Sequence, residues 1–472
     1  MKYRMRKLLG GAAVLLAGMC LAPMGASAQT EMLLPYTQPI FQSTWANPAV
    51  RPEHRFSFSI APLSSLELGV INDAFTIGGI SAKQGSKLLA DPEKLVAAVR
   101  EHKLNHGYAE FQADIFHFRM LWRNWNFWIG ARNVSTLSLT YPQHLVELTM
   151  YGNAHFLGKT MQFSDLAVSS TNYTELTLGA SKIMEKWVVG GRLSLLGGTF
   201  DAHTELKKFE VTVRDDRNRL YHHHVVADGQ VLMSGIPRNA DGGPAFGDFG
   251  KALGKYNYFN LRNPGLALSA AVAWKPEKNT NVTFAFSDLG FIRWGDGLST
   301  MDLKEVDYDW TRMGDLGQML MRRRLKWDNV RKKIEEILQI DSAKLRSGSA
   351  YTTWLSPKFH LMGTYRVARQ SVVGVSLSGI VHKGEFYPSA TVSFQQSYSN
   401  LIHAQVAWSY NQRSWTNVGF GVVFTPGPVQ MYLISDNMLG LILPKHMRAT
   451  NIRMGVNFVL GPLYDNHKLT NR

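Results

Sequence analysis

The stretch from residue 400 to residue 424, NLIHAQVAWSYNQRSWTNVGFGVVF, decides the fold because apolar and polar residues alternate through it twice. In its first half, Val406 and Trp408 fall on one face, whereas His403 and Gln405 fall on the other. After a two-residue turn the alternation resumes, with glycine and asparagine on the polar face. Period-two alternation over runs this long predicts two antiparallel β-strands, each with one apolar and one polar face.

The same pattern recurs along the rest of the chain. It is clear in residues 358–368 and 450–459, and short reversals such as Arg369-Gln370, Ser399-Asn400 and Pro426-Gly427 separate such runs. Earlier runs that fit the scheme cover residues 109–120, 126–139, 172–184, 187–200, 264–274 and 279–289. The sequence therefore predicts an all-β chain, an antiparallel meander of about 14 strands within a range of roughly 12 to 16.

The lengths of the strands and the positions of the aromatic residues distinguish a membrane barrel from other β architectures. The runs are about 10 to 12 residues long, the length that crosses a bilayer at a tilt. Aromatic residues stand near the strand ends: Trp187, Trp274, Tyr365, Trp408, Tyr410, Trp415 and Phe424. This combination favours a transmembrane antiparallel β-barrel, apolar towards lipid and polar towards the lumen. The alternative is a secreted β-sandwich or β-propeller, whose apolar faces would form a packed core.

Composition excludes several classes of protein. The chain has 472 residues, of which 45% are hydrophobic and 18% charged, so it is too apolar to be disordered. After residue 28, no uncharged apolar run is long enough for a spanning helix. The formal net charge of +15 would suit nucleic acid, but the N-terminus argues against that partner.

The N-terminus has the features of a signal peptide. MKYRMRK is a basic segment, an apolar stretch follows, and Ala26-Ser27-Ala28 resembles a cleavage site. We therefore expect residues 1–28 to be removed, and residues 29–472 to form a barrel in the outer membrane of a Gram-negative bacterium. Cys20 is the sole cysteine, so the mature chain would have no disulfide and no thiolate site. Export also makes a nucleic-acid partner improbable.

Two segments interrupt the meander. Residues 227–263 are rich in glycine, aspartate and asparagine and are interpreted as a long loop. Residues 295–356 contain a charged stretch from Arg322 to Lys333, followed by apolar residues at helical spacing. We expect a partly helical surface insert that packs on the barrel mouth. The alternative is a docking surface for lipopolysaccharide phosphate or a partner protein.

We expect no catalytic residues, no metal site and no cofactor from the sequence. Nucleotide-binding loops, zinc-protease motifs and serine-hydrolase elbows are absent from the sequence. His222-His223-His224 is the densest group of potential metal ligands, but neighbouring strand residues point to opposite faces, so two at most could share an ion. Solvated loop histidines are the simpler interpretation. His403 and Ser409 share a face but lie about 20 Å apart along a strand, too far for a nucleophile and its base.

The polar faces of the strands supply candidate ligand-binding residues. Those expected to face the lumen are Arg192, His360, Arg366, His403, Gln405, Arg453 and Asn457. One interpretation is a hydrated, hydrogen-bonded interior. The other is a pore that favours anions, or a contact for the carboxylate of an amphiphile.

A family resemblance is found at both ends of the chain. Asn47-Pro48-Ala49 resembles the element that opens barrels of the FadL-like group, the long-chain fatty-acid transporter type, although Val50-Arg51-Pro52 departs from that group's usual continuation. The chain more closely resembles an uncharacterised family of outer-membrane barrels from Bacteroidetes-type bacteria, a domain of unknown function. The matching stretches are NPAVRPEHRFSFSIAPLSSL (47–66), SDLGFIRW (287–294), GPVQMYLISDNMLGL (427–441) and NIRMGVNFVLG (451–461).

The resemblance implies an outer-membrane barrel, distantly FadL-like, and two functions follow as hypotheses. The first is a channel or transporter for hydrophobic or amphipathic small molecules. The second is a structural or partner-docking barrel of a surface-protein secretion or attachment system. An enzyme is not expected. The expected partners are outer-membrane lipid and lipopolysaccharide, an amphipathic ligand and a surface protein, with no nucleic acid.

Overall fold

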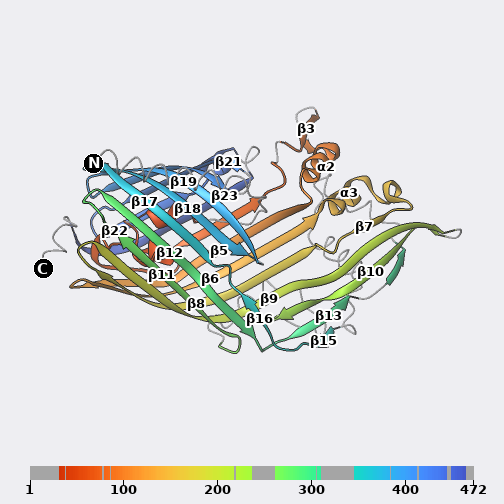
Figure 1. The fold of residues 1–472 in the computed structure, drawn as a ribbon, viewed down its shortest axis with the longest axis horizontal. Helices are drawn as coiled ribbons and strands as arrows, with labels where there is room; N and C mark the ends of the chain where they lie inside the picture. Colours follow the sequence, from red (N-terminus) through yellow and green to blue (C-terminus); the bar gives the residue numbers. More distant parts are fainter. Residues whose placement is uncertain are drawn as a thin grey trace.

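The computed structural model forms a closed antiparallel β-barrel of 14 strands (Figure 1), which confirms the predicted fold class and strand number. The structure describes residues 31–37, 39–76, 79–84, 87–216, 219–235, 261–303, 306–309, 345–382, 384–411, 414–443 and 448–463. Among these residues, no helix has the length and apolar character that a membrane-crossing helix requires.

The strands pair with their sequence neighbours around the barrel wall, as expected for a meander. In order they are β1 (His54–Ile60) with β2 (Leu66–Asn72), β5 (Leu104–Trp122), β6 (Trp125–Pro142), β8 (Ala167–Ile183), β9 (Trp187–Asp216), β11 (Pro264–Trp274), β12 (Thr280–Trp294), β17 (Lys358–Ala368) with the short β16 (Tyr351–Trp354), β18 (Ser371–His382), β19 (Glu385–Tyr398), β20 (Ile402–Asn411), β21 (Ser414–Phe424), β22 (Val429–Ser435) and β23 (Ala449–Pro462).

The first strand position closes the barrel, and it is interrupted. Both β1 and β2 pair with β5 on one side and with β23 on the other, so they occupy a single position in the wall. Residues 61–65 separate them, opposite a register shift in β5 between Asp114 and Phe116. Backbone hydrogen bonds from Ala61 to Ile115 (2.8 Å) and from Val456 to Leu63 (2.8 Å) still join this segment to both neighbours. The wall is therefore continuous at the interruption.

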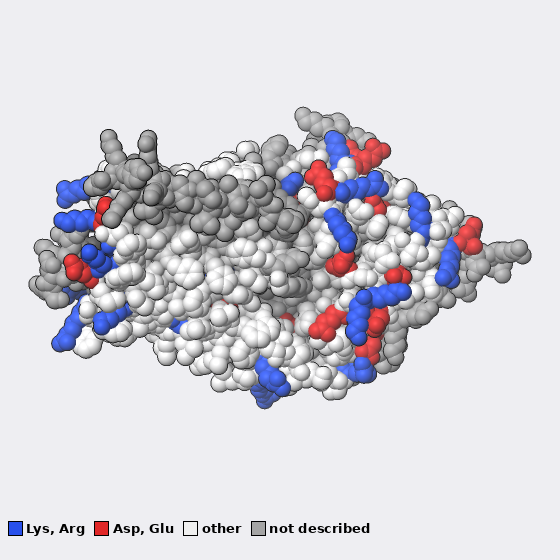
Figure 2. Space-filling model, viewed as in Figure 1, with Lys and Arg blue, Asp and Glu red and all other residues white. Residues whose placement is uncertain are grey.

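The outer surface of the barrel is apolar, as the alternation predicts. Val406 is 46% exposed and faces outward, whereas its neighbour Gln405 is 1% exposed and faces the lumen. Figure 2 shows a wall with few charges between two ends where lysine, arginine and acidic residues gather. Aromatic side chains mark the borders of this wall; Trp187 and Trp274 stack at one border with their ring centres 5.7 Å apart. Such a surface is suited to hydrocarbon, and its borders to the lipid headgroup region.

The two ends of the barrel differ. At one end the strands are joined by short turns, and we call it the turn end. At the other, the loop end, β9 and β10 (Arg219–Ser234) run far beyond the wall (Figure 1). The other loop-end elements are β3 (Ser81–Gln84), β4 (Lys87–Ala90), α2 (Pro92–Arg100), α3 (Gln143–Tyr151), η3 (Asn153–Phe156), β7 (Thr160–Gln162), β13 (Ser299–Leu303), β14 (Val306–Asp309), β15 (Leu345–Ser347) and α7 (Met438–Ile442).

The two segments that interrupt the meander contain more strand than the sequence suggests. Residues 227–234, assigned to a loop, continue β10 and pair with β9. Within residues 295–356, strands β13 to β16 are formed at the two ends of the insert. The helical part expected around Arg322 to Lys333, and residues 236–260 of the long loop, lie outside the described residues. His222 to His224 lie in β10, where they pair with residues of β9.

Candidate functional site in the barrel lumen

The lumen is filled by the chain that precedes the first strand. We call residues 31–37 and 39–53 the plug. Two single turns of 3-10 helix, η1 (Leu34–Tyr36) and η2 (Phe41–Trp45), fold it into a compact unit. Leu33 and Ile40 pack against Tyr432 and Ile434, which project inward from β22. This apolar cluster gives the plug a core of its own inside a largely polar barrel.

Hydrogen bonds attach the plug to the wall along its length. The backbone nitrogen of Leu33 donates to Asp436 (2.7 Å), and the amide of Gln405 donates to the hydroxyl of Thr37 (2.5 Å). Gln42 and Asn457 exchange two bonds between their side-chain amides, at 2.7 and 3.0 Å. Each such bond contributes only about 1 kcal/mol net, so the plug is fixed by many weak contacts.

A first ion cluster ties the start of the plug to the barrel. Glu31 accepts from Lys358 at 3.1 Å and from Arg453 at 2.8 Å, and Arg453 also bonds to Glu67 of β2. All four side chains are buried, so the two cations and two carboxylates balance one another in a medium that screens poorly. Removing one partner would leave a buried charge uncompensated.

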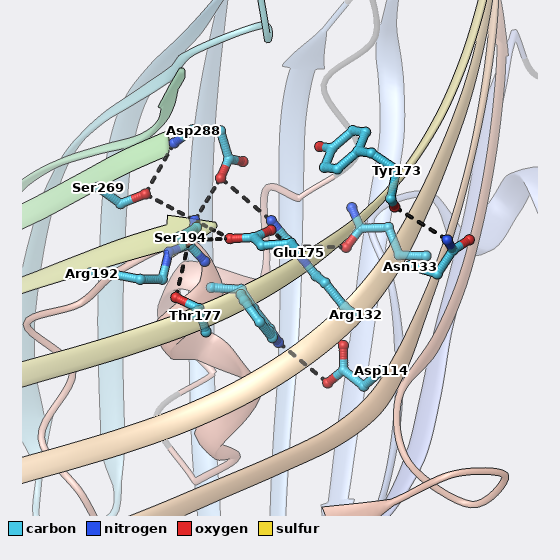
Figure 3. Close-up of polar contacts among 12 residues, drawn as sticks. Asp114, Arg132, Asn133, Tyr173, Glu175, Thr177, Arg192, Ser194, Ser269 and Asp288 are labelled. Atoms are coloured by element: carbon cyan, nitrogen blue, oxygen red, sulfur yellow. Dashed lines mark hydrogen bonds and ion pairs between the residues drawn. The ribbon is translucent and has the colours of Figure 1, made fainter. Parts of the chain in front are cut away.

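A second ion cluster is formed by Arg132, Glu175, Arg192 and Asp288 (Figure 3), and it lies next to Trp45 of the plug. Arg132 bonds to Glu175 at 2.7 Å, and Arg192 bonds to Asp288 at 2.5 Å. The guanidinium groups of Arg132 and Arg192 lie 4.3 and 5.0 Å from the ring centre of Trp45. Two cations and two carboxylates are again matched, and cation–π attraction holds the indole of the plug at the barrel centre.

One further hydrogen bond joins Trp45 of the plug to the barrel wall. Its indole nitrogen donates to Asp114 of β5 at 3.2 Å. Asp114 stands at the register shift opposite the interrupted first strand. The plug therefore contacts both the ion cluster and the irregular part of the wall.

Five of the seven predicted site residues lie buried in the lumen, and four of them hold structure together. Arg192 and Arg453 belong to the two ion clusters, and Gln405 and Asn457 bond to the plug. Their role in binding a ligand stays a prediction.

The other three predicted residues lie apart from those clusters. His360 shares a hydrogen bond with Ser378 (3.0 Å), and His403 shares one with Ser397 (3.0 Å). In both histidines the second ring nitrogen is buried and has no hydrogen-bond partner among the described residues. A catalytic serine–histidine pair needs a group that orients the histidine through that nitrogen, so neither pair has the geometry of a hydrolase site. Arg366 is exposed at the turn end.

Sequence reasoning selected Arg192 and Arg453 but missed Arg132 and Lys358, as well as the carboxylates that neutralise these cations. Glu67 and Glu175 stand on the polar face of alternating strands, which was a usable signal. The plug was missed as well. Its leucine, isoleucine, phenylalanine and tryptophan residues lack any period of two, which indicates buried chain that is not a strand.

A cavity of about 1140 Å³ opens at the turn end. An adjoining cavity of about 150 Å³ leads inward from it to Asn47 of the plug. Arg51, Lys275 and Arg366 line both spaces, and they come from the plug, the β11–β12 turn and the end of β17. Burial, together with the charges of Arg51 and Arg366, lowers the pKa of Lys275 to about 8.

The chain belongs to a family whose function is not known. A model described as "Family of unknown function (DUF5723)" matches residues 48–436, most of the chain. No protein with a curated description matches it.

Solved structures with a similar arrangement include two toluene transporters and a FadL homologue. The toluene transporter TbuX of Ralstonia pickettii is 10% identical with a TM-score of 0.42, over 89% of this chain and 94% of that one. A FadL homologue of Pseudomonas aeruginosa is 10% identical with a TM-score of 0.43, over 92% of this chain and 99% of that one. The toluene transporter TodX of Pseudomonas putida is 9% identical with a TM-score of 0.39, over 92% and 95%.

Proposed function

We propose that this protein is an outer-membrane channel that lets small hydrophobic or amphipathic molecules pass when the plug moves. The observation that carries the proposal is the plug itself. A barrel of about eight strands is filled by its own side chains, whereas a wider one encloses free space. Here a separate segment of the chain occupies that space, held by apolar contacts, hydrogen bonds and the ion pairs of Glu31. A lumen closed by a segment that is not part of the wall is suited to gated passage.

The chemistry of the lumen supports an amphipathic passenger. Leu33, Ile40 and Phe41 would leave apolar wall positions exposed if they withdrew, beside the hydrogen-bonding groups that now contact the plug. A molecule with an apolar body and one polar end could replace both kinds of contact. The apolar outer wall and the short turns at one end support a membrane position with the turn end in the periplasm.

Conductance in planar bilayers tests the gate. Deleting residues 31–46 should raise single-channel conductance well above that of the whole chain, because about 16 residues of filling leave the lumen. Deleting residues 209–227 is the control, because it removes a similar length from the β9–β10 hairpin beyond the wall. Slower migration on boiling would show that each barrel is folded. Equally low conductance from the folded plug deletion would refute the gate.

Passage of amphiphiles is tested separately, by measuring their uptake into cells. Cells that lack the protein should take up a labelled short-chain fatty acid or toluene more slowly, and the whole chain should restore uptake. Trp45→Ala removes the ring between Arg132 and Arg192 and should loosen the plug, so uptake should rise. Unchanged uptake in all strains would exclude these molecules as passengers.

A second candidate function rests on the hairpin that projects from the loop end. β9 and β10 form a small sheet with β7, β13 and β14, and Val211 and Val213 pack there on Leu148 and Phe156. A folded extension of this kind is suited to docking a surface protein. The deletion of residues 209–227 separates the two functions: a docking barrel would lose its partner while uptake stayed normal.

A further inference from the structure

The cations at the turn end differ from those deeper in the lumen because they lack counter-ions. Among the described residues, Arg51, Lys275 and Arg366 each have no carboxylate within ion-pair distance, although all three line the same connected cavities. The two arginines donate to backbone carbonyls: Arg51 to Met184 at 3.4 Å and Arg366 to Arg369 at 3.3 Å. Three like charges gathered without an anion are unfavourable unless something else supplies one.

Arg51 is the most informative of the three. It is 9% exposed, and its Nε has no hydrogen-bond partner among the described residues. A buried guanidinium donor left unpaired costs free energy, so native proteins keep such a group where a ligand or ion uses it. The cavity beside Arg51 provides the room for one.

The acidic residues of the cavity do not neutralise this cluster. Glu53 is the carboxylate nearest in sequence to Arg51, and the charge that acts on it is that of the buried Arg119 of β5. The charges that act on Lys275 are those of Arg51 and Arg366. The titratable and charged groups that surround Lys275 in the cavity are Arg51, Glu53, His54, Glu185, Lys186, Glu277, Lys278, Arg366, Arg369 and His403.

We propose that Arg51, Lys275 and Arg366 bind the carboxylate of a small amphipathic acid at the turn end of the lumen. Two arginines and a lysine supply the charged donors that a carboxylate prefers, and arginine can bond to both of its oxygens. Leu401, Ile402 and Val423 line another part of the cavity and provide an apolar surface for a short hydrocarbon chain. The inference rests on the proposed channel function, because it assigns the class of molecule that occupies the inner mouth of the passage.

The site lies on the path between the plug and the turn end. The inner cavity touches Asn47 and Ala49 of the plug, and the outer one is bordered by the turns on either side. An acid that had passed the plug would meet the cations before it left the barrel. The same site could hold an acid that entered from the turn end, and binding can be measured without any flow.

Calorimetry on the purified full-length barrel in a non-ionic detergent tests the site. Hexanoate should bind, and Lys275→Gln or Arg366→Gln should each weaken binding about tenfold, since each removes one charged hydrogen bond. Lys208→Gln is the matched control: it removes the same charge from an exposed pair with Glu210 at the loop end and should change nothing. Heat-modified migration confirms that each variant is folded.

Two further arms identify the ligand group. Hexanol, which has the same chain without the charge, should not bind at this site, and inorganic phosphate should bind far more weakly than hexanoate. Because Lys275 is about half protonated at pH 8, hexanoate binding at that pH should take up protons, and Lys275→Gln should reduce the uptake. Repeating the titration in buffers of different ionisation enthalpy measures this uptake.

The results of these experiments distinguish failure of the carboxylate site from failure of the proposed gate. No hexanoate binding, or equal binding by the cation variants, overturns the site even if the plug deletion opens the channel. Phosphate binding as tight as that of hexanoate overturns the assignment of an amphipathic acid. A channel that stays closed after plug deletion, with hexanoate still bound through Lys275, refutes the gate and leaves the site in place.

Discussion

The cations of the middle of the lumen and those of the turn end have opposite surroundings. Arg132, Arg192 and Arg453 each bond to a carboxylate and are fully buried. Lys275 and Arg366 line an open cavity and have no such partner among the described residues. Arg366 stands on the polar face of its strand, as Arg192 and Arg453 do, so the sequence pattern alone treats these three residues alike.

This difference distinguishes cations that stabilise the fold from cations that are available to bind a ligand. A matched buried pair is costly to break but offers nothing to a ligand, because its bonds are already used. A cation without a counter-ion destabilises the protein, and binding of an anion to it is therefore favourable. The mid-lumen clusters therefore hold the plug, and the turn-end cluster is the place where we expect binding.

The largest effect should come from breaking a mid-lumen pair. Arg453→Met leaves Glu67 buried without a cation and Glu31 with Lys358 alone, and should lower the free energy of unfolding by about 3 to 5 kcal/mol. Urea unfolding of the barrel in lipid measures the change. Combining it with Glu67→Gln should recover most of the loss, because Glu31 then keeps Lys358 as its cation. Equal losses in the single and double variants would show that this cluster is not an ion network.

The second-largest loss of stability should come from a charge placed on the apolar outer surface of the barrel. Val406→Arg places a cation in the middle of the apolar wall and should cost about 2 to 4 kcal/mol. Val367→Arg makes the same exchange one residue from the turn end of β17 and should cost about 1 kcal/mol or less. Similar losses at the two depths, again by urea unfolding in lipid, would contradict a membrane-facing wall.

The smallest effect has the opposite sign. The pKa of Lys275 is about 8 in the folded protein and near its ordinary value of about 10.4 when unfolded. Between these values the unfolded chain binds more protons, so stability should rise as pH increases from about 8 to 10. The two pKa values alone would correspond to about 3 kcal/mol, but water in the open cavity screens Lys275. Lys275→Gln should therefore stabilise the barrel by about 1 kcal/mol at pH 7 and lose that advantage above pH 10. Destabilisation at pH 7 would show that Lys275 has a structural anion.

The barrel could be predicted from the sequence because its signal is local. Alternation at Val406 and Gln405 depends on neighbouring residues alone, and the structure confirms both the strand number and the faces. Short turns then leave a meander as the simplest order.

The plug and its ion network could not be predicted in the same way. Glu31 and Arg453 are 422 positions apart, and Gln42 and Asn457 are 415 apart, so no local pattern links them. Lys275 was missed for a different reason. It is the first residue after a strand, and only the closed barrel brings it near Arg51 and Arg366.

Ion selectivity of the opened barrel tests the central contrast most directly. With residues 31–46 deleted, the reversal potential across a salt gradient should indicate preference for anions, because unmatched cations line the turn end. Adding Lys275→Gln and Arg366→Gln should move that potential toward zero, whereas Lys208→Gln should leave it unchanged. A reversal potential that does not respond to loss of the two turn-end cations would contradict the account.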